Sequence, residues 1–188
     1  MKKERVINTQ RALVAALFLG AVTFGYAQEA AAAQETVANA TAQVQTSQQN
    51  PAIDALKKKI EANPNDTESL VNLATAYQDA KDWKNALGTW NKISTLLPDW
   101  APSYYSEGYV YQNMKDDANA KTAYEKYIAA VKPEELEASK KNLAYAHLFV
   151  AYQLKESNKE QAKQHIAKSL EYDPSNQDAL NLSKFLNQ

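Results

Sequence analysis

The residues that could perform chemistry are few and widely spaced. The chain has 188 residues, no cysteine and two histidines, His147 and His165, which lie 18 positions apart. Two isolated histidines do not form the ligand spacing that a zinc site requires. We therefore expect no metal and no cofactor, and we interpret each histidine as a surface or core residue.

Phosphate-binding loops and nucleophilic sites also lack the residues they need. From Gln28 onward the only glycines are Gly88 and Gly108, which is too few for a glycine-rich loop or a nucleophile elbow. The carboxylate pair Asp116–Asp117 falls in a predicted turn, where solvation explains it. The chain is therefore predicted not to be an enzyme and to have no catalytic residue.

The charge balance bears on possible partners. The 21 Lys and Arg residues nearly match the 22 Asp and Glu residues, and Arg5 and Arg11 are the only arginines. Nucleic-acid binding by phosphate neutralisation needs a marked cationic excess. We therefore expect no nucleic-acid partner.

The N-terminus has the pattern of a secretory signal. Residues 1–11 are basic, residues 12–27 are uncharged and mostly apolar, and Gly25 and Ala27 supply small residues for cleavage. A helix of this apolar length spans about 24 Å, less than the ~30 Å hydrocarbon core. We predict a signal peptide over residues 1–27, cleavage after Ala27 and no stable membrane insertion afterwards. Export to the bacterial periplasm or beyond would follow, while an uncleaved anchor stays open as the alternative.

Residues 28–50 consist mainly of Ala, Gln, Thr and Val and contain no aromatic residue. Such a segment cannot build a core. We interpret it as a low-complexity linker that holds the folded part away from its neighbours.

The remainder of the chain repeats itself. Pro64 and Pro98 lie 34 residues apart, and residues of similar size recur at that offset: Leu70, Ala74, Tyr77, Ala86, Trp90 and Ile93 are followed by Tyr104, Gly108, Tyr111, Ala120, Tyr124 and Tyr127. The apolar residues of each unit form two stripes of helical period. Each unit is therefore predicted to be a pair of amphipathic helices.

At these positions the chain resembles the tetratricopeptide repeat (TPR) family, whose unit is a 34-residue helical hairpin that ends in proline. The resemblance implies an all-α fold: a right-handed α-solenoid of about three helix-turn-helix units between a half repeat and a capping helix. The expected units are a half repeat at 51–64, full units at 67–98, 101–133 and 134–174, and a cap at 176–188. We expect this array to be complete.

Two departures from the pattern stand out. Glu107 occupies the position of Leu73 in the preceding unit, so this carboxylate is either at a looser edge or paired. The third unit is seven residues longer, which predicts one long helix over about 134–155 that keeps its buried face. We assign the matching core roles in that unit to Tyr145, Phe149, Tyr152, Ala162 and Ile166.

The resemblance also implies a concave groove, lined by the first helix of each hairpin, that binds an extended or helical peptide. We predict that the binding residues are Thr75, Gln78, Asp79, Tyr105, Tyr109, Gln112 and Asn113. Other aligned groove positions are Glu68, Val71, Asn72, Ser106, Ala146, His147 and Val150. Tyr105 and Tyr109 are one turn apart. They are the main candidates for contact with the peptide, because tyrosine offers a large contact area and a hydroxyl. The alternative is that these tyrosines pack against the neighbouring first helix or the long helix of the third unit.

The predicted function is a non-enzymatic protein–protein interaction scaffold or adaptor of the cell envelope, with a protein or peptide as its partner. Two alternatives stay open. One is an uncleaved, inner-membrane-anchored accessory factor of a translocation or assembly complex. The other is a self-associating structural protein.

Overall fold

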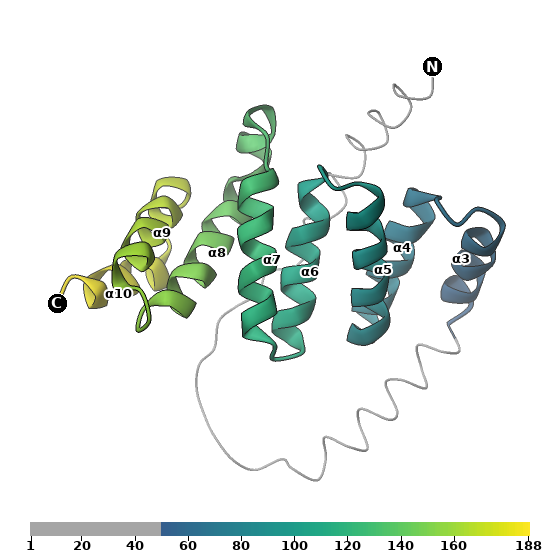
Figure 1. Ribbon diagram of the computed structural model, residues 1–188, viewed down its shortest axis with the longest axis horizontal. Coiled ribbons are helices and arrows are strands. Elements are labelled where there is room, and N and C mark those ends of the chain that lie inside the picture. Colours follow the sequence, from purple (N-terminus) through teal and green to yellow (C-terminus); the bar gives the residue numbers. More distant parts are fainter. Residues whose placement is uncertain (1–49) are drawn as a thin grey trace, which may run out of the picture. The chain divides into compact units, whose positions relative to one another are not determined.

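The computed structural model describes residues 50–188, which form eight α-helices and one short 3-10 helix without a strand (Figure 1). The predicted signal peptide and almost all of the predicted linker lie outside these described residues. The predicted all-α fold class is confirmed. The chain divides between Thr89 and Trp90 into two compact units.

The first unit contains α3 (Pro51–Ala62), α4 (Thr67–Asp79) and the beginning of α5 (Trp83–Leu96). Helix α3 packs on α4, and its position agrees with the predicted half repeat. The stripe predicted for α4 is buried as expected: Leu70, Leu73, Ala74 and Tyr77. The 3.6-residue period therefore identified the inward face of this helix correctly.

The second unit contains the end of α5 and five further α-helices. These are α6 (Ala101–Asn113), α7 (Asp117–Ala130), α8 (Leu136–Leu154), α9 (Lys159–Tyr172) and α10 (Gln177–Leu186), with the 3-10 helix η2 (Pro133–Glu135) before α8. From α6 onward each α-helix packs on the next one in the chain. This succession of neighbours is the arrangement of a solenoid, and Figure 1 shows these helices following one another in chain order.

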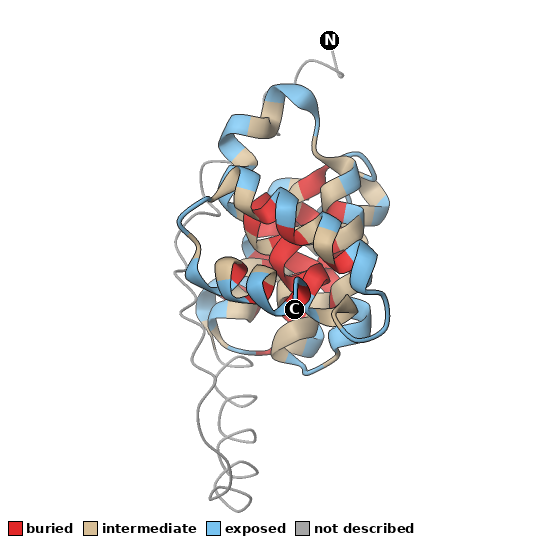
Figure 2. Cartoon of the chain, turned by 90° about the vertical axis from the view of Figure 1, so that its left-hand side faces the viewer, coloured by how far each residue is buried: buried red, intermediate tan, exposed pale blue. Residues whose placement is uncertain are grey.

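Two apolar clusters hold the second unit together. The first joins α6, α7 and α8 around Tyr124, Tyr127 and Phe149. The second joins α8, α9 and α10 through residues that include Ala151, Ile166, Leu182 and Leu186. Buried residues gather in the interior in Figure 2, and exposed residues cover the outer helix faces. Because α8 contributes to both clusters, it links the two hairpins of this unit.

Gly108 allows α6 and α7 to approach closely. A Cβ added at this position would lie 2.8 Å from Cε1 of the Tyr124 ring, which is fully buried. Real Cβ atoms do not come this close to a neighbour, so the ring occupies the space that any other side chain would need. The approach of α6 to α7 is therefore a direct contact between the helix backbone at Gly108 and the Tyr124 ring.

The first two hairpin turns share one backbone geometry. Lys81 and Lys115 both have positive φ, 57° and 62°, and they are 34 residues apart. Each following aspartate, Asp82 or Asp116, then caps the next helix by accepting a bond from the backbone N–H three residues on. The repeat is thus visible in backbone angles as well as in side chains.

The long helix of the third unit is confirmed, with a correction at its start. Helix α8 has 19 residues against 13 in α6, but Pro133 opens the 3-10 turn η2 and the α-helix begins only at Leu136. The Lys132 backbone N–H donates to Glu135 in this turn at 3.3 Å. The first proline-containing turn is therefore tighter than we predicted.

The core role predicted for Tyr152 is wrong. Tyr152 is 40% exposed, and the ammonium of Lys155 lies 3.8 Å from its ring centroid. The α8 residues that pack in the cluster with α9 are instead Leu148 and Ala151. The equivalent residue of α6, Tyr111, is itself only half-buried, and the buried residues beside these two tyrosines are Val110 and Ala151.

Candidate functional site

The predicted binding residues of α6 share one face of that helix. Tyr105, Tyr109, Gln112 and Asn113 follow the i, i+4, i+7, i+8 spacing, and all four are half-buried. This face combines two aromatic rings with two amides. It lies entirely within the second unit.

Tyr105 is used largely for packing. Its ring lies edge-on to Tyr124 and Tyr127 of α7, at centroid distances of 5.5 and 5.1 Å, and to Tyr145 of α8 at 6.3 Å. Burial raises the pKa of Tyr105 far above its usual value of 10.0. The packing alternative, including contact with the long helix of the third unit, therefore describes this ring, and its role in binding stays a prediction.

Gln112 is held in place by two hydroxyls from other helices. Its Oε1 accepts hydrogen bonds from Tyr145 at 2.8 Å and from Tyr124 at 3.2 Å. Because these donors belong to α8 and α7, the amide joins three helices. Its carbonyl is thus occupied internally, and the amide NH2 is the part that could donate to a bound backbone.

Asn113 and Tyr109 are linked through the α6 backbone. The Asn113 Nδ2 donates to the Tyr109 carbonyl oxygen at 2.8 Å. This bond orients the asparagine along the helix. The Asn113 Oδ1 is the atom of this side chain that can accept a hydrogen bond from an N–H group of a partner. The pair therefore presents an aromatic ring beside an oriented amide.

The remaining predicted binding residues lie on α4, in the first unit. Thr75 donates its hydroxyl to the Val71 carbonyl at 2.9 Å, Gln78 is half-buried, and Asp79 is exposed at the last position of the helix. They form a separate polar patch, and their part in binding also stays a prediction.

Several other aligned groove positions are core residues. Ala146 and Val150 are completely buried in the cluster around Tyr124, and Val71, Ser106 and His147 are also buried. Residues with so little exposed area contribute packing and not contact with a partner. The family alignment placed them correctly on the first helices but did not resolve which way they face.

Glu107 fits neither of the two predicted outcomes: it is not at an exposed edge, and it forms no ion pair among the described residues. It is buried, its Oε1 has no hydrogen-bond partner among the described residues, and burial raises the pKa of its carboxyl above the usual 4.5. A hydrogen bond from Ser94 and the charge of Lys126 oppose that shift. Burial of this carboxylate therefore carries a desolvation cost.

The two histidines form a contact that the sequence reasoning missed. Although they lie 18 positions apart, their Nδ1 atoms are only 3.0 Å apart across α8 and α9. Within residues 50–188 no three His, Cys, Asp or Glu side chains are grouped so that they could hold a metal ion. The signal available in the sequence was the predicted hairpin, which brings two helices together at just this separation along the chain.

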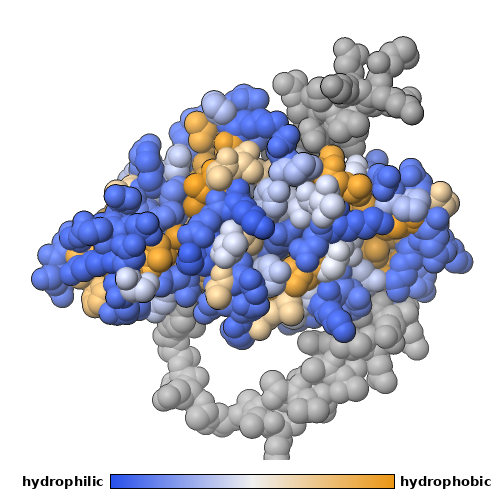
Figure 3. All heavy atoms as spheres, viewed as in Figure 1, coloured by the Kyte–Doolittle hydropathy of each residue, from blue (hydrophilic) through white to orange (hydrophobic). Residues whose placement is uncertain are grey.

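One face of the described residues is mainly polar. The face seen in Figure 3 is mostly hydrophilic with narrow hydrophobic strips, and the large apolar or aromatic side chains that are exposed in the described region are Met114, Tyr152 and Phe185. None of the helices in this region is long and apolar enough to cross a membrane.

Comparison with known proteins identifies the repeat. A family model described as tetratricopeptide repeat matches residues 101–130, which span α6 and α7. No curated protein sequence matches the chain. The sequence match assigns a tetratricopeptide repeat to residues 101–130, and the helical hairpins of the described residues have the fold of such repeats.

Solved structures agree with this fold. The C-terminal part of a TPR repeat-containing protein from Cytophaga hutchinsonii is 22% identical, with 74% of this chain and 57% of that chain covered and a TM-score of 0.62. A crystal structure of MamA is 21% identical, with 71% and 74% covered and a TM-score of 0.58. MamA from Desulfovibrio magneticus RS-1 is 19% identical, with 84% and 86% covered and a TM-score of 0.57. At these identities the likeness concerns the fold alone.

Proposed function

We propose that this protein is a non-enzymatic interaction scaffold that binds a peptide or protein segment along the α6 face formed by Tyr109, Gln112 and Asn113. The observation that carries the proposal is the fixed position of Gln112, whose carbonyl is held by the hydroxyls of Tyr124 and Tyr145. A surface ordered before binding loses less conformational entropy when the partner arrives. Tyr105 supports this face from below through its ring contacts.

The residue types of the face suit an extended backbone. A tyrosine ring supplies contact area at low entropy cost, and amide side chains both donate to and accept from peptide groups. A small surface of this kind supports micromolar binding, about 8 kcal/mol. That affinity is appropriate for an adaptor that must also release its partner.

The proposal places the protein in the cell envelope, exported and released after cleavage behind Ala27. This part is supported by the basic segment, the apolar run and the small residues Gly25 and Ala27. Intact mass of the protein isolated from its cells tests it. A chain that begins at Gln28 supports export with cleavage, whereas a chain that retains residues 1–27 favours the anchored accessory factor.

The binding face is tested by site-specific photo-crosslinking in an envelope extract. A photoreactive phenylalanine analogue replaces Tyr109 in the full chain, and the matched control carries it at Tyr152, which is exposed on α8. The proposal expects one discrete partner to be captured from position 109 and not from position 152. Equal capture from both positions, or none from position 109, would contradict it.

Affinity for the captured partner is then measured with Tyr109→Ala and Asn113→Ala. We expect about tenfold weaker binding for Tyr109→Ala, since central tyrosines typically contribute more than about 1 kcal/mol. Tyr105→Phe is used in place of an alanine variant because the Tyr105 ring is part of the core. The α4 patch is assessed separately with Gln78→Ala and Asp79→Ala, and unchanged affinity there confines the site to α6.

A further inference from the structure

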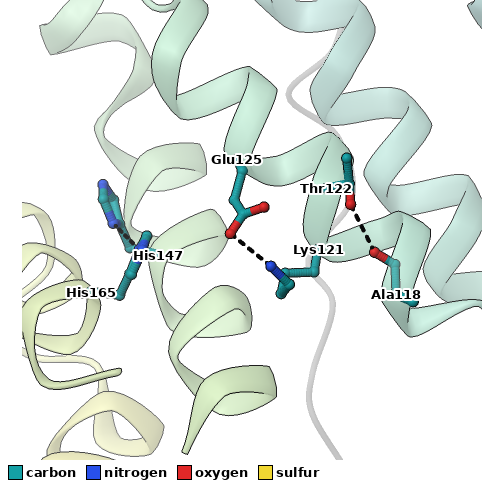
Figure 4. A network of polar contacts seen from close by, with 6 residues as sticks. All are labelled: Ala118, Lys121, Thr122, Glu125, His147 and His165. Atoms are coloured by element: carbon teal, nitrogen blue, oxygen red, sulfur yellow. Dashed lines mark hydrogen bonds and ion pairs between the residues drawn. The ribbon is translucent and has the colours of Figure 1, made fainter. Parts of the chain in front are cut away.

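The His147 and His165 rings meet at the contact between α8 and α9. Their Nδ1 atoms are 3.0 Å apart, and the ring centroids are 5.1 Å apart at an interplanar angle of 46° (Figure 4). His147 is only 7% exposed and His165 is half-buried. These are the only histidines in the chain.

Hydrogen bonding between two Nδ1 atoms limits how many protons the pair can hold. One ring must donate an N–H and the other must offer a lone pair. The contact therefore tolerates two neutral rings, or one neutral ring beside one imidazolium. When both rings are imidazolium, two N–H groups and two positive charges face each other at 3.0 Å.

The charged groups around the pair are already paired with each other. From α7, Lys121 bonds Glu125 at 2.9 Å, and on α9 Lys168 bonds Glu171 at 2.7 Å. The Tyr172 ring lies 5.9 Å from the His147 ring. Each ion pair carries no net charge, so neither supplies a whole negative charge to neutralise a second imidazolium.

These surroundings distinguish the two rings. Burial, followed by the charges of His165 and Lys168, lowers the pKa of His147 from 6.5 to about 4, with Glu171 opposing. Burial also lowers the pKa of His165, but there the nearby Glu125 carboxylate opposes the shift before Lys121 adds to it. The first proton therefore settles on His165 and the second on His147.

We propose that the His147–His165 pair is an acid-sensitive latch, which keeps α8 and α9 together while it carries at most one positive charge and separates them when the second proton binds. Separation would expose the cluster that contains Ala151 and Ile166, and it would release α10, which packs on α9. The latch is independent of the binding face proposed for α6.

The direction of the pH dependence follows from the lowered pKa values. A histidine whose pKa is lower when α8 and α9 are closed contributes stability that is complete above about pH 6.5 and is lost as the pH falls toward 4. For a shift from 6.5 to about 4, linkage gives about a 25-fold rise in the open population between pH 7 and pH 5.

Two measurements on the full chain test the latch. Histidine ring protons followed by NMR from pH 8 to pH 3.5 give the pKa of each ring, and the presence of only two histidines makes assignment direct with single variants. Amide exchange at pH 7 and pH 5, corrected for intrinsic rates, gives the protection of the α8–α9 backbone, with α6–α7 as the internal reference.

We expect both pKa values below 6.5, a pKa near 4 for His147, and an increase in that pKa when His165→Asn removes its partner. We also expect protection in α8–α9 to fall about 25-fold on acidification, and no such fall in the His147→Gln/His165→Gln double variant. A wild-type pKa at or above 6.5 for His147 would overturn the proposal. So would an unchanged His147 pKa in His165→Asn, or an equal loss of protection in the double variant; Gln164→Ala serves as the control for substitution on α9.

Discussion

In the α6–α7 hairpin a fully buried tyrosine ring lies against a glycine, whereas in the α8–α9 hairpin two histidine rings share a hydrogen bond. Both are pairs of α-helices. Helix α8 packs on α7 of the first hairpin and is itself the first helix of the second. The ring of Tyr124 is neutral at every ordinary pH, because burial raises its pKa well above 10.0. Burial lowers the pKa of both histidines, to about 4 for His147, so their contact responds to acid.

The comparison shows that two hairpins of one fold are held together by contacts that respond differently to pH. Packing of Tyr124 against Gly108 depends on shape, and its cost of disruption is the same at pH 7 and pH 5. The contact between His147 and His165 depends on proton count. Variants that alter one hairpin at a time can therefore separate loss of shape from loss of proton control.

The largest expected effect is the loss of an interior side chain from each hairpin. Tyr124→Ala removes a ring that packs on Tyr105, Tyr145 and Phe149, and we expect the free energy of unfolding to fall by about 3–5 kcal/mol. Ile166→Ala in α9 should lower it by about 2–3 kcal/mol. Urea denaturation at pH 7 measures both, and a smaller loss for Tyr124→Ala would show that the aromatic cluster is not the main support.

The next effect concerns the glycine itself. Gly108→Ala places a Cβ 2.8 Å from the Tyr124 ring, and we expect a net loss of about 1–2 kcal/mol in unfolding free energy from overpacking. Gly88→Ala is the matched control, because an added Cβ there meets no described atom within 4 Å. Alanine should stabilise that helix by about 0.5–1 kcal/mol. Opposite shifts in melting temperature confirm the close approach, and shifts of one sign refute it.

An effect of similar size is expected at Glu107, where the α6–α7 hairpin has a proton dependence of its own. Burial raises the pKa of this carboxyl, so the wild type loses stability as the pH rises from about 4.5 through the raised value. Glu107→Gln should stabilise the protein by about 1–2 kcal/mol at pH 7, and this gain should vanish near pH 4.

The difference between variant and wild type in urea midpoint, measured at several pH values, isolates the Glu107 contribution from that of the histidines. A gain that persists unchanged at pH 4 would show that Glu107 is not the titrating group. The sign is opposite to that of the histidine latch, which sharpens the contrast between the two hairpins.

The smallest expected effect comes from a single hydroxyl. Tyr145→Phe removes the 2.8 Å bond to Gln112 and should cost about 0.5–1.5 kcal/mol of unfolding free energy. Tyr152→Phe, on the exposed side of the same helix, should stay within about 0.5 kcal/mol of wild type. Equal effects of the two substitutions would argue that Gln112 is not held by the Tyr145 hydroxyl.

Much of the fold was predictable because it is encoded locally. The buried stripe of α4 and the paired helices of each unit follow from apolar residues that recur at fixed spacing. The exposure of Tyr152 was not predictable in the same way, since Tyr111 at the equivalent position of α6 is half-buried while Leu148 and Ala151 pack in the cluster with α9. A spacing rule matches residue types and does not say how deeply a ring is buried.

The candidate site was less predictable than the fold. The sequence placed Tyr105 and Tyr109 correctly on one helix face, but only three-dimensional packing shows that Tyr105 joins the aromatic cluster and that Gln112 bonds two distant hydroxyls. The burial of Glu107 and the meeting of His147 with His165 also depend on neighbouring helices. Such contacts between helices leave no periodic trace in the chain.

The first two hairpin turns resemble each other more in backbone geometry than the repeats do in side chains. Lys81 and Lys115 turn the chain through the same angles, and the aspartate after each closes a bond to the tyrosine carbonyl five residues earlier. Sequence recognition reads side chains and finds residues 101–130, whereas backbone superposition extends over 74% of the chain. The turn thus keeps the same backbone geometry in two units whose side chains differ, so the two helices of each hairpin leave it in the same relative direction.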